Sequence, residues 1–383
     1  MENYVVNLRR ELHEHPEIGF DLPQTLAILR RELDALGVEY TEKYGKSSIV
    51  ATINPEKSHF TIGVRADMDA LPIKEMNDVP YKSKNEGAMH ACGHDAHTAV
   101  VMATLRRVWE MRDQINCRVK FIFQPAEEFA PSGAMLMARD GVMQDMDCIV
   151  AMHVDTNFHA GQLAITTGPQ NANSDGFYLD FYGKSAHAAN QEKGVDANVM
   201  AMRAFMDIEL VVAKSFSAKE PIIFNVGAIH GGTANNILCD HCSMFCTLRT
   251  WNDSVREGML TYIKAITESV ALTSGGKATF TPAKYYPIIH NDPIITERFR
   301  AAGVKVVGEK NMFQNARGMG GEDFSYFANE KPGSFMRLGI KPADKEKIPG
   351  LHNDHFNIDE SALEVGVNTF LQFILDNQNG IEF

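Results

Sequence analysis

Short apolar runs alternate with amphipathic stretches through the first part of the chain. Leucines recur at helical spacing from Leu26 to Leu36, and Gly37 follows as a C-cap. Four apolar runs predict buried strands and two longer stretches predict helices. The strands are 48–53, 60–66, 118–123 and 148–152, and the helices are 97–114 and 132–143. Strands that alternate with helices indicate an α/β sheet covered on both faces.

The order of elements changes in the middle of the chain. A strand, a helix, two strands, a helix and a strand are predicted at 177–183, 196–214, 221–229, 236–250, 255–275 and 277–287. This βαββαβ order is that of a ferredoxin-like module of about 110 residues. A strand at 333–339 and a helix at 359–378 then return to α/β character. We therefore expect an α/β domain with a mixed sheet between helices, formed by 1–172 and 289–383 and interrupted by a smaller domain, 173–288.

Composition and charge narrow the possible partners. Hydrophobic residues make up 44% of the 383 positions and charged residues 22%, as in ordinary globular proteins. The net charge of −12 disfavours nucleic acid as a partner. The start of the chain is charged within a few residues, unlike a signal peptide, and no apolar run is long enough to span a membrane. Six scattered cysteines do not form a disulfide framework, so we expect a cytoplasmic protein with free thiols.

Polar side chains gather where several predicted strands end. Asp67 and Asp69 follow one strand, the stretch "QPAEE" (124–128) follows another, and His153 follows a third. The segment "HACGHDAHT" (90–98) leads into a predicted helix. Ligands of open α/β sheets bind beyond the carboxyl ends of the strands. These groups therefore converge on one edge of the sheet.

The groups that converge there are those that bind divalent metal ions. A cysteine thiolate with imidazoles and carboxylates is a ligand set for zinc and related ions. More than four donors suggest two ions with a shared ligand, an arrangement that suits hydrolysis. Of the adjacent acids Glu127 and Glu128, one can bind metal while the other remains free as a base.

Further motifs resemble one known family. In chain order they are "RRELHEHPEIGF", "RADMDALPI", "HACGHDAHT", "FQPAEE", "GKSAHAA", "GGTANNI", "GGEDFSYF" and "LHNDHFNIDE". Together they resemble the M20 metallopeptidases, in particular the amidohydrolase branch of aminoacylases, hippurate hydrolases and auxin-conjugate hydrolases. The resemblance covers nearly the whole chain and implies a di-metal catalytic domain interrupted by a small dimerisation domain. The chain departs from the family at "FAPSGA" (129–134), where many members have a glycine-rich turn, which puts the shape of the neighbouring pocket in question.

The resemblance also implies roles for individual residues. Cys92 would bridge the two ions, in place of the bridging aspartate of other M20 branches. Glu127 would be the general base that takes a proton from water, and Asp67 would orient a metal ligand. The implied metal ligands are Cys92, His94, Glu128, His153 and His352.

Three residues of the small domain match positions that act on substrate in this family. His187 would reach the active site from the partner subunit of a homodimer and polarise the scissile carbonyl. Asn236 and Arg249 would contact substrate, and the fork of Arg249 suits a carboxylate. A structural salt bridge is the alternative for Arg249, and a hydrogen-bonding loop residue is the alternative for His187.

The predicted function is metal-dependent hydrolysis of N-acyl amino acids to a carboxylic acid and a free amino acid. Two divalent ions are expected, and zinc, manganese, nickel and cobalt remain open. Hydrolysis of dipeptides or aryl amides is an alternative, as is a non-catalytic binder of acyl amino acids. For His90 and His97 we expect capping or support of the ligands, and for His13 and His15 a structural turn. The CxxC at 239–242 has no second ligand pair and predicts buried cysteines instead.

Overall fold

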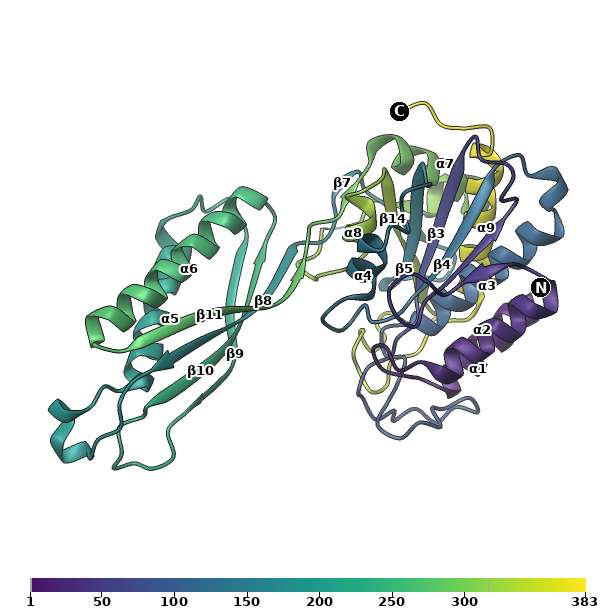
Figure 1. Cartoon of the computed structure of the whole chain (residues 1–383). Coiled ribbons are helices and arrows are strands. Elements are labelled where there is room, and N and C mark those ends of the chain that lie inside the picture. The colour runs from purple at the N-terminus through teal and green to yellow at the C-terminus, as the bar shows by residue number, and fades with distance from the viewer. Residues whose placement is uncertain (1, 316) are drawn as a thin grey trace. The chain divides into compact units, whose positions relative to one another are not determined.

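The computed structural model describes residues 2–315 and 317–383. The chain divides into two compact units (Figure 1). Unit 1 comprises Met1–Gln170, Ile289–Ala316 and Asp323–Phe383, and unit 2 comprises Asn171–Ile288 and Arg317–Glu322. Among the described residues, none of the helices has the length and apolar content that crossing a membrane requires. All six cysteines are free.

Unit 1 contains an eight-stranded mixed sheet in the order β1-β2-β4-β3-β5-β14-β6-β13. Its central strands β4, β3, β5 and β14 run parallel to one another, whereas β2 is antiparallel to both of its neighbours, β1 and β4. The strands are β1 Tyr40–Thr41, β2 Ile49–Ile53, β3 Thr61–Asp67, β4 Arg118–Gln124, β5 Cys148–His159, β6 Leu163–Ala164, β13 Met312–Phe313 and β14 Gly333–Lys341. A separate two-stranded sheet pairs β7 (Gly168–Pro169) with β12 (His290–Asn291).

Helices cover both faces of this sheet, because successive side chains of a strand point to opposite sides. In β5, for example, Val150 packs in the larger core with α1, α2, α3, α7 and α9, and its neighbour Ile149 packs in the smaller core with α4 and α8. This explains why the strands read as continuous apolar runs. The helices are α1 Glu2–Glu14, α2 Pro23–Leu36, α3 His94–Glu110, α4 Gly133–Arg139, α7 Pro293–Val307, α8 Ser325–Ala328 and α9 Ser361–Asn377, with short 3₁₀ turns η1 Arg112–Gln114 and η3 Glu309–Asn311.

Unit 2 is a four-stranded antiparallel sheet in the order β11-β8-β10-β9, with α5 and α6 along one face (Figure 1). The fourth, first, third and second strands of the module therefore lie side by side. Its elements are β8 Asn173–Tyr182, η2 Ala188–Lys193, α5 Ala197–Lys214, β9 Ile222–Gly231, β10 His241–Thr250, α6 Asp253–Ser274 and β11 Lys277–Tyr286. The prediction of an α/β fold with a mixed sheet between helices and a smaller βαββαβ domain is confirmed.

Four details differ from the predicted elements. The strand predicted at 148–152 continues to His159, so His153 lies within β5 and does not follow it. The helix predicted at 97–114 begins three residues earlier, at His94, because Gly93 adopts a positive φ of 85° that lets the chain turn directly into the helix. The strand predicted from residue 236 begins at His241, because residues before it pair with the loop of His187 instead. Helix α7 was not predicted, although Asp292 caps it and Pro293 occupies its first turn.

Candidate metal centre

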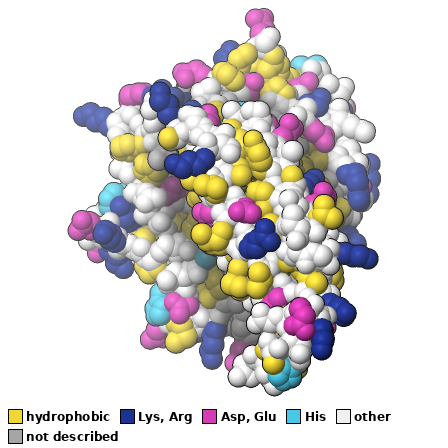
Figure 2. Space-filling view, turned by 90° about the vertical axis from the view of Figure 1, so that its left-hand side faces the viewer, with side chains coloured by type: hydrophobic (Ala, Val, Ile, Leu, Met, Phe, Trp, Pro, Cys, Tyr) yellow, Lys and Arg dark blue, Asp and Glu magenta, His cyan; other side chains and the backbone are white. Residues whose placement is uncertain are grey.

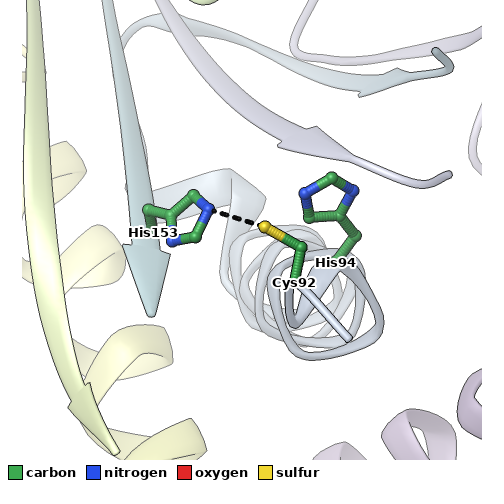
Figure 3. Close-up of side chains that lie close together, drawn as sticks. All are labelled: Cys92, His94 and His153. Carbon is green, nitrogen blue, oxygen red and sulfur yellow. Dashed lines mark hydrogen bonds between the residues drawn. The ribbon is translucent and has the colours of Figure 1, made fainter. Parts of the chain in front are cut away.

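A tight turn before α3 brings Cys92 and His94 into the interior. Gly93 lies between Cys92 and His94. A Cβ atom added to it would lie 2.5 Å from Val154 Cγ2, so only glycine fits at this position. Cys92 and His94 are both buried. Figure 3 shows Cys92 at the start of the helix with its sulfur directed at His153 of β5, and the distance from Sγ to Nε2 is 3.4 Å.

His94 and His153 are each held by the Nδ1 atom of the ring, which leaves Nε2 facing the cluster. The Nδ1 atom of His153 donates to the Val154 carbonyl at 2.7 Å, and the Nδ1 atom of His94 donates to the Asp69 carbonyl at 2.8 Å. Burial, helped by the nearby His97, holds the pKa of His153 well below its usual value, so its Nε2 carries a free lone pair. This is how metal-binding imidazoles are normally oriented.

Two carboxylates reach the cluster from the turn after β4. Glu127 is buried, and Oε1 of Glu128 lies 3.0 Å from Nε2 of His352. The residue before them, Ala126, has a positive φ of 51°, a conformation that alanine rarely adopts. Such strained residues occur where the surrounding structure holds them in place for function.

His352 comes from a loop before α9 and is fixed beside Cys92. Its backbone N–H donates to the Ala91 carbonyl at 2.8 Å, and its φ of 62° is also positive. Half of its side chain is exposed, in contrast to the buried His94 and His153. The loop therefore places the His352 imidazole on the solvent side of the cluster.

The structure brings all five predicted ligands together with Glu127. Among the described residues, five sets of side chains have ligand atoms within 4.8 Å of one another, and three of these sets consist of predicted ligands and Glu127 alone. Cys92, His94 and Glu128 each belong to two of these three sets, so the sets overlap as they would around two neighbouring cations. The sets are Cys92, His94 and His153; Cys92, Glu128 and His352; and His94, Glu127 and Glu128.

The donor atoms fit divalent cations. His94 Nε2 is buried without a hydrogen-bond partner, a costly arrangement unless another group binds there. Burial also raises the pKa of the Cys92 thiol well above its usual value, although His94 opposes the effect. A buried sulfur becomes a thiolate most readily beside a cation, so a metal ion would satisfy both atoms.

The structure places Asp67 beside His97. Oδ1 of Asp67 accepts from His97 Nδ1 at 2.6 Å, and Nε2 of His97 in turn accepts from the Val154 N–H at 3.0 Å. Asp67 Oδ2 lies 2.9 Å from Arg65 and 3.8 Å from His94 Nε2. Asp67 thus supports, through His97, the backbone beside His153, and it also lies close to His94.

Asp69 is a site residue to which the sequence analysis gave no individual role. Its two carboxylate oxygens accept from the backbone N–H groups of Glu127 at 2.9 Å and Glu128 at 3.1 Å. Its carbonyl also receives the hydrogen bond from His94. One residue therefore holds three members of the cluster. The only signal in the sequence was its position just after the apolar run predicted as a strand at 60–66, and Asp67 shares that position.

We expect Asp69→Asn to reduce metal affinity or activity by about 10- to 100-fold, the usual effect of losing a group that orients metal ligands. An amide has one acceptor oxygen, and its NH₂ group would face a backbone N–H donor. Metal titration of the apo-protein would measure the change. Asp147→Asn is a matched control, because Asp147 also accepts a backbone N–H, from Thr61, but belongs to no ligand set. Equal metal affinity in both variants would contradict the role of Asp69.

The predicted substrate residues lie in unit 2. His187 caps the turn η2, and its Nδ1 accepts from the Ala189 N–H at 3.0 Å. Asn236 lies beside it, since its carbonyl accepts from the Ala188 N–H at 2.9 Å. Arg249 lies in β10, away from these two residues in the strand register.

Arg249 lines a cavity of about 260 Å³ in unit 2. Its guanidinium contacts the Ser174 hydroxyl, and burial lowers its pKa. The nearby carboxylate of Asp175 is bound by Arg256, with distances of 2.6–3.1 Å. Arg249 therefore lines a cavity while the neighbouring Asp175 carboxylate is engaged by Arg256.

Comparisons with known proteins place this site in a family. The family model described as peptidase family M20/M25/M40 matches residues 63–376. Thermostable carboxypeptidase 2 of Saccharolobus solfataricus is 31% identical over 370 residues, which cover 96% of this chain and 93% of that protein. N-acetylcysteine deacetylase of Bacillus subtilis is 31% identical over 369 residues, which cover 96% of this chain and 95% of that protein.

A solved structure of the same family is also similar to this chain. The YXEP protein of Bacillus subtilis, a dinuclear metal binding peptidase from the M20 family, is 28% identical, covers 99% of both chains and has a TM-score of 0.81. The match spans both units of the fold and all five predicted ligands. The chain belongs to peptidase family M20/M25/M40.

Proposed function

We propose that the protein is a metal-dependent amidohydrolase that cleaves N-acyl amino acids to a carboxylic acid and a free amino acid. The observation that carries this proposal is Glu127. It is a buried carboxylate that lies among the ligand atoms while Glu128 and His352 contact each other. A pure binding site needs no such additional base. The deacetylase among the relatives acts on an N-acyl amino acid by its name, which supports the same substrate class.

The chemistry divides between the cations and the side chains. Two divalent cations, held by Cys92, His94, Glu128, His153 and His352, would lower the pKa of water and polarise the amide carbonyl. Glu127 takes the proton of the attacking water and delivers it to the leaving nitrogen. Asp69 holds the backbone of Glu127 so that this carboxylate stays in place.

A panel of substrates tests the proposal. Apo-protein is loaded with zinc, manganese, nickel or cobalt and incubated with acetyl, benzoyl and long-chain acyl amino acids, and the free amine is measured. We expect turnover of at least one N-acyl amino acid with a free carboxylate, and less turnover of its carboxamide, because Arg249 would bind the carboxylate. Cleavage of peptides but of no N-acyl amino acid would instead favour a carboxypeptidase, the activity named for another relative.

We propose further that the protein forms a homodimer through unit 2. Large apolar side chains of α5 are exposed at helical spacing, namely Val199, Met202, Met206 and Leu210. Strand β9 lies at the edge of the sheet and can pair with a second copy. Hydrophobic side chains are visible among polar ones on the face in Figure 2. A two-fold contact between identical faces is the commonest way to cover such a surface.

We expect Met206→Lys to convert a dimer into monomers, because two buried cations would face each other across the two-fold contact. Met206 is 64% exposed in the single chain, so the change costs little within the subunit. Sedimentation equilibrium measures the mass. Leu272→Lys is the control, since Leu272 of α6 is 80% exposed but lies off the α5 face. A Met206→Lys dimer as tight as the control would exclude this interface.

For His187 we propose a role in the site of the partner subunit, where it would stabilise charge on the carbonyl oxygen. We expect His187→Ala to lower kcat by about 10²–10³-fold, the usual cost of removing one such donor, without loss of metal. Mixing inactive Glu127→Gln and His187→Ala chains should restore about a quarter of wild-type activity, since half of randomly paired dimers are mixed and one of their two sites is intact. Demonstrated subunit exchange without recovery would exclude action in trans.

A further inference from the structure

Helix α1 carries two basic side chains that are almost completely buried. Arg9 is 0% and His13 is 1% exposed, although charged side chains are rarely buried unless they are paired. Both belong to the motif "RRELHEHPEIGF", for which the proposed mechanism has no role. In contrast to Arg9 and His13, the side chain of Arg10 on the same helix is 43% exposed.

The buried pair meets two buried carboxylates. Nε of Arg9 donates to Asp95 Oδ2 at 2.7 Å, and Nδ1 of His13 lies 2.7 Å from the same oxygen. The other ring nitrogen of His13 lies 3.1 Å from Glu75 Oε1. His13 thus lies between two carboxylates, and its Nδ1 also lies 3.3 Å from Nη2 of Arg9. Arg9 also lies 3.3 Å from Glu360, so the two basic side chains meet two buried carboxylates and a third that is partly exposed.

Both buried carboxylates connect to segments of the metal centre. Asp95 follows His94 directly, in the first turn of α3, and Cys92 lies three residues before it. Glu75 accepts the Ser83 N–H at 2.7 Å and so holds the loop that begins at Asp69. The same motif reaches this loop again, where the Glu17 carbonyl accepts the Ala70 N–H at 2.7 Å.

We propose that Arg9 and His13 are positioning residues of the metal centre. Through Asp95 they fix the turn that carries Cys92 and His94, and through Glu75 they fix the loop of Asp69. A buried, mutually paired set of charges has few alternative arrangements, whereas apolar packing alone tolerates small shifts. Metal sites need their ligands within about 0.5 Å of the required positions. This inference rests on the proposed metal site but not on the identity of the substrate.

Cobalt binding tests the inference without substrate. The thiolate of Cys92 gives Co²⁺ a charge-transfer absorption band, which reports the geometry at the sulfur. We expect His13→Gln to weaken Co²⁺ binding about 10-fold, the lower end of the range for residues behind metal ligands, and to change the intensity of this band. Arg9→Met should do the same, and Arg9→Lys, which keeps the charge, should recover part of the affinity.

Arg31→Ala is the matched control, because Arg31 pairs with Glu11 of α1 and with Glu32, which are not partners of Arg9 or His13. It should lower the denaturation midpoint of the apo-protein and leave Co²⁺ affinity and the band as in wild type. Should Arg9→Met fail to fold, His13→Gln decides alone. A His13→Gln protein with a lowered apo midpoint but wild-type Co²⁺ affinity and band would overturn the proposal. Absence of hydrolysis by the wild-type protein would count against the proposed function alone.

Discussion

Glu127→Gln is expected to abolish turnover while the protein keeps both metal ions. Glutamine has nearly the same shape, and its backbone N–H can still donate to Asp69. It cannot accept a proton from water or deliver one to the leaving nitrogen. Removing a general base costs about 10²–10⁴-fold in rate, so kcat should fall by at least that range.

The neighbouring acid is the matched control. Glu128 contacts His352 and belongs to a ligand set with Cys92, so Glu128→Gln should lose metal as well as activity. Metal analysis of both purified variants, together with kcat measured at saturating metal, separates the two roles. Loss of an ion from Glu127→Gln, with full occupancy in Glu128→Gln, would show that the assignments are reversed.

The location of the site could be predicted because the carboxylates of Asp67, Glu127 and Glu128 lie at or just after the ends of β3 and β4. His153 and the Glu127–Glu128 pair lie in or after apolar strands, and parallel neighbours bring such positions to one edge. The βαββαβ module could also be predicted from the sequence, because strands and helices differ in length and in the spacing of their apolar residues. Both predictions depend on sequence patterns within single strands and helices.

The supporting contacts could not be predicted, because they join residues that are far apart in the chain. Arg9 and Asp95 are 86 positions apart, and no periodicity relates them. The same holds for the backbone of Glu127, which binds a carboxylate 58 positions earlier. The positive φ angles of Ala126 and His352 were also hidden, since residues other than glycine give no sign of them. Tertiary contacts impose these conformations.

Cys92→Ala is expected to lower metal content and activity together. Cys92 belongs to two ligand sets, and the family resemblance implies that it bridges the two cations. Its loss would then remove one donor from each cation and leave two positive charges without an anion between them. We expect metal affinity to fall by more than about 100-fold, beyond the effect of changing a group behind the ligands. Titration of apo-protein with a chromophoric chelator as competitor gives the affinity, and metal analysis gives the stoichiometry.

Two further variants make the Cys92 result specific. Cys148→Ala removes a buried thiol from β5 that belongs to no ligand set, and it should leave metal content unchanged. Cys92→Asp should recover much of the metal that Cys92→Ala loses, because a carboxylate can also lie between two divalent cations. If Cys92→Ala keeps two ions and a near-normal rate, the sulfur is no ligand, and the remaining donors, His94, His153, Glu128 and His352, must hold the ions without a shared thiolate.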